Sequence, residues 1–222
     1  MNLSKSLAER KATNKQNIPA EKWAIMETST NKLKELSLST KALQTGDILP
    51  TFTLPDVNNK SRSLSDFKED FLVISFYRGG WCPFCNMELR ALQNILPQLN
   101  KLNTALVAIS PETPDNSLTT SEKNKLTFSV LSDLENQYAK SLGLVFQLPE
   151  DLRSVYHSFN LNVDKHNGNK DYELPMPATY IVNKKREIIY NFTPEDYTER
   201  LDPEKVLAII SEATLQKQQH LF

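Results

Sequence analysis

The amino-acid sequence predicts an α/β fold whose central β-sheet is mixed. Apolar, β-branched runs of strand length alternate with helical segments through the first half of the chain, a pattern typical of parallel strands joined by helices. Closer to the C-terminus, two strand-like runs at 178–182 and 187–192 flank a short polar turn. Such a pair is typical of an antiparallel hairpin. A sheet that contains both kinds of pairing is mixed.

Length and charge limit the classes of protein that fit. The chain has 222 residues and a formal net charge of -1, which suits one domain with an extension. Near-neutral charge argues against nucleic acid as a partner, because a basic patch would be expected. No apolar run approaches the roughly 20 residues of a membrane span, and residues 1–15 lack the apolar core of a signal peptide. We therefore expect a cytoplasmic protein with no nucleic-acid and no membrane partner.

Three segments are predicted along the chain. Residues 1–43 form an N-terminal helical extension, residues 44–216 the main domain, and residues 217–222 a frayed C-terminal tail. The first part of the extension is polar, and we expect it to be disordered or loosely helical. The helix that follows, from Pro19 to about Leu36, is expected to pack on its own domain. A dimerisation arm that forms a homodimer is the alternative.

Within the main domain the elements follow in order, each from its local pattern. Apolar and β-branched runs predict strands, and Pro, Ser or Asp before an apolar stripe predicts a helix start. The predicted strands are 51–54, 71–77, 104–109, 127–131, 178–182 and 187–192. The predicted helical segments are 63–67, 83–99, 114–124, 133–142, 150–158 and a last helix from Asp202. Residues 143–174 are the least regular, and a loop of this length is often functional or mobile.

Both cysteines of the chain lie where the buried strand 71–77 gives way to a helix. Pro83 suits the first helical position, which makes Cys82 the N-cap. The unpaired N–H groups and the positive dipole end of a helix start favour a thiolate. Such settings lower a cysteine pKa from about 8.5 to roughly 3.5–7.5. Cys85, four residues before Leu89 on the apolar stripe, should be the more buried sulfur, and Cys82 the more exposed one.

Three plainer interpretations of the cysteine pair compete with catalysis. Inert core cysteines do not account for this spacing on a strand-to-helix turn. A structural zinc ion needs four ligands, and the three histidines show no metal-type spacing. A structural disulfide across so short a loop would restrain the unfolded chain little. Cytoplasmic thiols are kept reduced, so the pair is expected to be catalytic, with no metal and no cofactor.

Several spaced motifs resemble the peroxiredoxins of the AhpC/TSA family, which elaborate the thioredoxin fold. The segments that carry the resemblance are GDILPTFTLP at 46–55, FYRGGWCPFC at 76–85, ISPETPDNS at 109–117, LPMPATYIV at 174–182 and DYTER at 196–200. They are most similar to a bacterial branch called peroxiredoxin-like proteins. The resemblance covers roughly residues 44–215. It implies a thioredoxin-like fold, thiol oxidoreductase activity, and a cis peptide bond before Pro177 that faces the cysteines.

The resemblance leaves the attacking cysteine open. Peroxiredoxins carry Thr-x-x-Cys, and gapless counting places Cys85 at the reactive position and Cys82 at that of the threonine. Thioredoxin-type reductases imply the reverse, with Cys82 attacking and Cys85 resolving. Exposure favours Cys82, whereas spacing favours Cys85.

The preferred hypothesis is a thiol peroxidase that reduces hydrogen peroxide or an organic hydroperoxide. One cysteine becomes a sulfenic acid and the other condenses with it to a disulfide, which thioredoxin or another thiol reductant recycles. Arg78 is the candidate to lower the thiol pKa and polarise the peroxide, and Arg200 is a weaker candidate of the same kind.

Two further hypotheses stay open. The protein could exchange disulfides with other proteins, with the site lined by Trp81, Pro83, Met176 and Pro177. It could also be a non-enzymatic redox-sensing or binding module that assembles through its N-terminal arm.

Overall fold

A computed structural model describes residues 2–219 of the chain. The α-helices are α1 (Leu3–Asn17), α2 (Ala20–Leu36), α3 (Leu38–Lys41), α4 (Pro83–Lys101), α5 (Pro114–Asn124), α6 (Gln137–Ser141), α7 (Glu150–Ser158), α8 (Val163–Asn167) and α9 (Pro203–Gln219). The strands are β1 (Thr53–Pro55), β2 (Ser61–Ser63), β3 (Phe71–Phe76), β4 (Thr104–Ser110), β5 (Ser129–Ser132), β6 (Val145–Gln147), β7 (Glu173–Pro175), β8 (Ala178–Asn183) and β9 (Ile188–Phe192). Two 3-10 turns, Leu64–Asp66 and Leu134–Asn136, precede β3 and α6.

Five strands form the central sheet in the order β5-β4-β3-β8-β9. β3 pairs in parallel with β4, and β4 with β5. β8 pairs antiparallel with both β3 and β9. The predicted mixed sheet is therefore confirmed. β1 with β2 and β6 with β7 form two small antiparallel pairs outside it.

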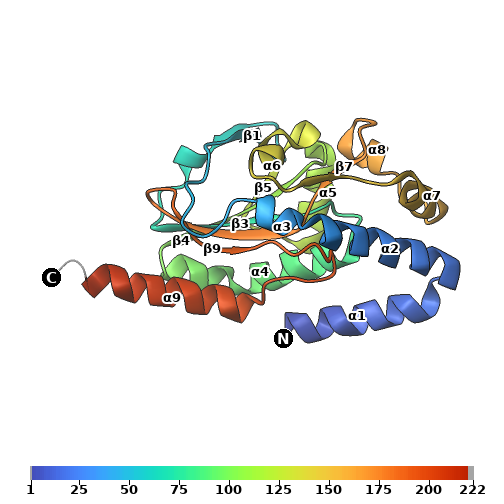
Figure 1. Ribbon diagram of the computed structural model, residues 1–222. Helices are drawn as coiled ribbons and strands as arrows, with labels where there is room; N and C mark the ends of the chain where they lie inside the picture. The colour runs from blue at the N-terminus through green and yellow to red at the C-terminus, as the bar shows by residue number, and fades with distance from the viewer. Residues whose placement is uncertain (1, 220–222) are drawn as a thin grey trace.

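Alternation along β3 divides the core into two layers. Leu72, Ile74 and Phe76 face one cluster, and Val73 and Tyr77 face the other, as the period of two in a strand requires. The second cluster is closed by α4 and α9, which lie side by side beneath the sheet (Figure 1). The apolar stripe of α4 predicted from sequence is the stripe that it buries here. This packing places the N-terminus of α4, and with it the cysteine pair, beside the C-terminal end of β3.

The N-terminal extension is ordered, so the expectation of a disordered or loosely helical start is wrong. α1 and α2 form a helical hairpin beside the sheet (Figure 1). Leu3 and Leu7 are each 3% exposed and belong to the same core cluster as Cys85 and Leu89 of α4. The sequence of α1 did not indicate this packing because the helix has few apolar residues. Two leucines one turn apart are enough to dock it.

Helix α2 packs on its own chain, through Met26 against an apolar cluster that contains Leu152 and Tyr156 of α7. The dimerisation arm stays a prediction that a single chain does not test. At the other end, α9 continues to Gln219 rather than fraying from residue 217, and residues 220–222 of the predicted tail lie outside the described residues.

The irregular segment 143–174 holds more structure than its sequence indicates. The helix expected at 150–158 is confirmed as α7, and α8 ends inside the polar loop. Strands β6 and β7 were not expected. Each has three residues and pairs only with the other, so neither is long enough to show an alternating pattern.

The packing of α1 leads to a stability prediction. We expect Leu7→Ala to lower the free energy of unfolding by about 2–4 kcal/mol, because it leaves a cavity in a core that cannot fully collapse. Urea unfolding followed by circular dichroism measures this loss. Glu9→Ala, at an exposed position on the same helix, should change the free energy by less than about 0.5 kcal/mol. Equal small effects from both variants would show that α1 does not dock in solution.

Candidate active site

The cysteine pair sits at the position predicted from sequence. β3 ends at Phe76, a five-residue turn follows, and Cys82 is the N-cap of α4 with Pro83 in the first turn. The Cys82 carbonyl accepts a hydrogen bond from the backbone N–H of Asn86 at 3.1 Å, the first helical bond. The Cys85 sulfur lies in the first turn of α4, where unpaired N–H groups and the helix dipole favour negative charge.

The turn before the cysteines is held by buried polar contacts. Gly79 adopts φ +148, a conformation that side chains disfavour, and a Cβ on Gly80 would lie 1.9 Å from the Thr120 hydroxyl. The Gly80 N–H donates to buried Glu112 at 2.9 Å, and the Gly80 carbonyl accepts from the Asn86 side chain at 2.7 Å. The glycine pair is therefore required for this turn to pass so close to α5.

Both sulfurs are buried: Cys82 is 1% exposed and Cys85 is fully covered. Cys82 was expected to be the more exposed sulfur, but the two differ by only 1% because both are covered. Position in a helix does not reveal what packs over it. Here the pair shares its apolar cluster with Leu3 and Leu7 of α1 and with the half-buried ring of Trp81.

Arg78 is buried beside the pair and enclosed by aromatic rings. Its guanidinium lies 4.5 Å from the ring centre of Tyr197, 4.9 Å from that of Trp81 and 5.7 Å from that of Tyr156. It also donates a hydrogen bond to the Tyr156 hydroxyl. Within residues 2–219 no carboxylate lies at ion-pair distance from Arg78, which is 2% exposed. A buried cation needs a compensating charge, and the cysteine pair is the group that can supply it.

Arg200 lies on the other side of the pair and has a carboxylate partner. Its Nη2 donates to the Cys85 sulfur at 3.2 Å, and its Nε donates to Glu88 at 2.5 Å. The Tyr197 and Glu199 carbonyls accept from its Nη1. Burial raises the pKa of Glu88 to about 7, although Arg200 acts in the opposite direction. Near neutral pH, Glu88 therefore offsets only part of the Arg200 charge.

The two cysteines differ in their preferred charge. Burial alone would raise the pKa of Cys82. The hydrogen bond from Cys85 and the charges of Arg78 and Arg200 outweigh it and lower this pKa to about 6. The pKa of Cys85 is raised well above its ordinary value by burial and by the neighbouring Cys82 thiolate, to which it donates. The pair therefore holds one negative charge at neutral pH, and we assign it to Cys82.

Three of the four other residues predicted to line the site lie near the cysteine pair or Arg78. Trp81 and Pro83 are half-buried beside the pair, and Trp81 packs edge-on against Tyr156 with ring centres 5.7 Å apart. Pro177 is buried and lines a cavity of about 20 Å³ with Arg78, enough for one water-sized molecule.

Met176 does not line this site. It is fully buried in the core cluster on the opposite face of the sheet, and its N–H donates to the Leu144 carbonyl. Met176 and Pro177 lie in the two-residue link between β7 and β8, where Met176 packs in this core cluster and Pro177 lines the cavity beside Arg78. The peptide bonds of the described residues are all trans, so the expected cis bond before Pro177 is wrong. The trans form is the ordinary one even before proline.

Sequence reasoning missed three residues that contact the predicted ones: Glu88, Tyr156 and Tyr197. Glu88 carried a readable signal, because it interrupts the buried stripe of α4 between Cys85 and Leu89. Tyr197 lies in the DYTER segment that carries the family resemblance, whereas Tyr156 had no such signal, since it belongs to a helix 78 positions away from Arg78 in the chain. Over the described part of the chain, no cluster of three or more His, Cys, Asp or Glu side chains could hold a metal ion. No helix in that part is long and apolar enough to cross a membrane.

The cysteine pair lies within a segment of the chain that is similar to a known protein family. Residues 45–191, which include β3, both cysteines and the whole central sheet except the end of β9, match the AhpC/TSA family. The chain belongs to the AhpC/TSA family. The predicted family resemblance is thus confirmed.

Among the relatives of this AhpC/TSA chain are two named peroxiredoxins. The chain is 30% identical over 102 residues to peroxiredoxin Bcp of Escherichia coli K12, which covers 46% of this chain and 65% of the relative. It is 30% identical over 156 residues to chloroplastic peroxiredoxin Q of Populus jackii, which covers 68% of this chain and 63% of the relative. The chain therefore spans a little under two thirds of the length of each.

Solved structures show the same fold. Peroxidoxin BcpB from Mycobacterium tuberculosis superposes with a TM-score of 0.62 at 19% identity, over 77% of this chain and 97% of that one. A peroxiredoxin-like protein from Aquifex aeolicus gives 0.61 at 16% identity, over 77% and 88%. The predicted thioredoxin-like fold, with N-terminal helices beside a central mixed sheet, is confirmed.

Proposed function

We propose that this AhpC/TSA protein is a thiol peroxidase that works through a Cys82–Cys85 dithiol and disulfide cycle. The observation that carries the proposal is the buried guanidinium of Arg78, which has no carboxylate partner within the described residues and lies beside the cysteine pair. A thiolate at Cys82 balances that charge. A low-pKa thiolate next to a fixed cation is the arrangement that peroxide reduction needs.

In the first step the Cys82 thiolate attacks the terminal oxygen of the hydroperoxide. A sulfur–oxygen bond forms, the oxygen–oxygen bond breaks, and the departing alkoxide or hydroxide takes up a proton. Arg78 is positioned to stabilise the negative charge as it moves from sulfur to oxygen. Cys82 is left as a sulfenic acid and the peroxide as an alcohol or water.

In the second step Cys85 attacks the sulfur of the sulfenic acid. A disulfide forms, and the hydroxyl group leaves as water with the proton that Cys85 loses. Arg200, whose Nη2 is 3.2 Å from the Cys85 sulfur, favours the Cys85 thiolate as that proton departs. A thiol reductant, thioredoxin or one like it, then restores the two thiols, which fits a reducing compartment such as the cytoplasm.

Two observations favour the reversed assignment, in which Cys85 attacks. Arg200 contacts the Cys85 sulfur directly, and Cys85 stands at the peroxiredoxin spacing. We favour Cys82 as the attacking sulfur because Arg200 already pairs with Glu88, whereas Arg78 has no carboxylate partner within residues 2–219 and needs the thiolate to balance its charge. Protein disulfide exchange is the less favoured function, because every step of it would need a second protein to reach a sulfur that is 1% exposed, whereas a hydroperoxide is a small molecule.

Stopped-flow mixing of the reduced protein with hydrogen peroxide tests the proposal. Fluorescence of Trp81, which adjoins the pair, should change in a phase at least about 100-fold faster than a free thiolate reacts, because fixed donors stabilise the departing oxygen. Mass spectrometry should then find the loss of two hydrogens per chain. A rate no faster than that of a free thiolate would remove the peroxidase proposal, and reduction of insulin disulfides would then be the activity to measure.

A further inference from the structure

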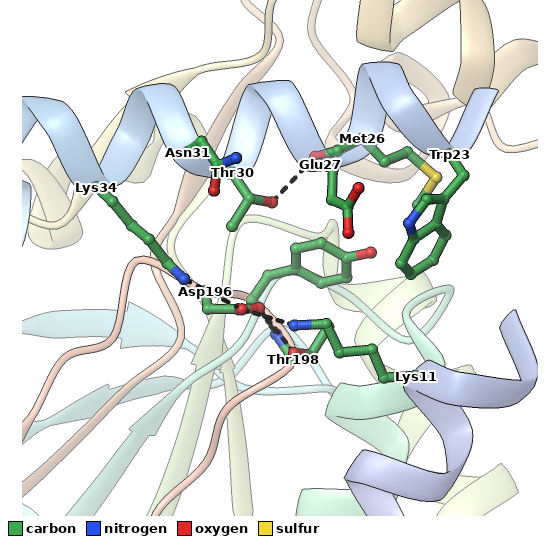
Figure 2. A pocket seen from close by; sticks show the side chains of 10 residues that line it. Lys11, Trp23, Met26, Glu27, Thr30, Asn31, Lys34, Asp196 and Thr198 are labelled. Atoms are coloured by element: carbon green, nitrogen blue, oxygen red, sulfur yellow. Dashed lines mark hydrogen bonds and ion pairs between the residues drawn. The ribbon is translucent and has the colours of Figure 1, made fainter. Parts of the chain in front are cut away.

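A second cavity shares Met26, Thr30 and Tyr197 as lining residues with the small cavity beside Arg78. It has a volume of about 240 Å³ and is lined by residues of α1, α2 and the segment that follows β9. Figure 2 shows the ammonium groups of Lys11 and Lys34 meeting Asp196 at one end, and Trp23 with Met26 at the other. The cavity is about ten times larger than the one beside Arg78, and no step of the proposed mechanism uses it.

Two ammonium groups share one carboxylate at the charged end of this cavity. Lys11 and Lys34 pair with the same Asp196 oxygen, at 2.8 Å and 3.5 Å. Burial alone would raise the pKa of Asp196, but the hydrogen bonds from Lys11 and Thr198 hold it at about 2. Asp196 is therefore charged at any physiological pH. The carboxylate of Glu195 lies close enough to Lys34 to interact with its charge, so Lys34 faces two acids and Lys11 faces one. The other acid of the wall, Glu27, has its own cation 3.7 Å away on α1.

The opposite end has a hydrogen-bond donor without a partner. Trp23 is 7% exposed, and its ring N–H makes no hydrogen bond. In Figure 2 the nitrogen edge of the Trp23 ring faces the cavity. A buried donor left unsatisfied costs free energy, which an acceptor on a bound molecule would recover. The Trp23 ring and the Met26 thioether offer apolar surface between the two polar ends.

We propose that this cavity is a binding site for a short organic acid that carries a second acceptor oxygen, as an oxo acid does. The carboxylate accepts from Lys11 and Lys34, the second oxygen accepts from the Trp23 N–H, and the carbon chain packs on Met26. The volume limits the ligand to a small molecule, since sites for drug-sized ligands start at roughly 300 Å³. No step of the cysteine chemistry uses this site, although Met26, Thr30 and Tyr197 line both cavities.

Calorimetric titration of the intact protein with three related compounds tests each contact. Levulinate has the carboxylate and the ketone oxygen, pentanoate has only the carboxylate, and methyl levulinate has only neutral acceptors. We expect levulinate to bind about 3- to 10-fold more tightly than pentanoate, the usual net value of one hydrogen bond. Methyl levulinate should bind at least about tenfold more weakly, as expected when a charged hydrogen-bond partner is lost.

Two variants separate recognition from a loss of structure. Trp23→Phe should weaken levulinate to the level of pentanoate and leave pentanoate itself unchanged, because only levulinate uses the N–H. Lys34→Met should weaken both acids at least about fivefold and leave the ester unchanged. Lys32→Met, at an exposed position of the same helix, controls for overall charge and should change neither acid.

Three results would overturn the proposal. One is equal binding of levulinate and its methyl ester. Another is an absence of heat from levulinate at millimolar concentration. The third is a Trp23→Phe variant that binds levulinate as the wild type does, or that loses pentanoate as well. None of these results depends on peroxidase activity, so the site can fail while the proposed function stands, and the reverse.

Discussion

Cys82→Ser is expected to abolish the fast reaction with hydrogen peroxide, with a fall in rate of roughly 1,000-fold or more, as when a nucleophile is removed. The serine cannot supply a thiolate, and Cys85 alone has a raised pKa because it is buried. Cys85→Ser should retain the fast first phase, since its hydroxyl can still donate to the Cys82 sulfur. That variant should accumulate a sulfenic acid, which dimedone traps, and should stop after one turnover.

The pair of single variants also decides between the two cysteines. A fast Cys82→Ser variant and a silent Cys85→Ser variant would assign the attack to Cys85 and to the side of Arg200. The matched control is the double variant, which should show no fluorescence change with peroxide. Because both substitutions replace sulfur by oxygen at a buried position, differences between them report chemistry rather than packing.

Arg78→Met is expected to raise the pKa of Cys82 from about 6 towards its ordinary value. Below its pKa a thiol loses its thiolate form tenfold for each pH unit. The wild type should therefore keep about half of its full reactivity at pH 6, whereas the variant should fall to half at a higher pH. At pH 7 we expect the reaction with peroxide to be about tenfold slower or more, and slower still if Arg78 also stabilises the departing oxygen.

Ultraviolet absorbance of the thiolate, measured against pH, follows this pKa without using peroxide. Arg10→Met, at an exposed position on α1, is the matched control and should leave the midpoint unchanged. A midpoint that stays near pH 6 in Arg78→Met would show that Arg78 does not balance the thiolate. The charge would then have to be held by Arg200 and the helix N-terminus alone.

Much of the fold can be predicted from the chain because its signals are local. The run of apolar residues at 71–77 shows a buried strand whatever surrounds it. Pro83 shows where α4 starts, and this start in turn places Cys82 at the N-cap. Such preferences act over one or two turns of chain, so a single sequence displays them. The short strands β6 and β7 fall below that range, which is why they were missed.

Only the tertiary structure decided how the cysteine pair is surrounded. The sequence by itself determined a dithiol at a helix start with an arginine four residues before Cys82. It did not show that both sulfurs are buried, that Tyr156 and Tyr197 enclose Arg78, or that Glu88 pairs with Arg200. The burial of a side chain and its charged partners depend on segments that are distant in the chain. The charge of a thiol depends in turn on its burial and on those partners. The pKa of Cys82 is therefore a property of the folded chain as a whole.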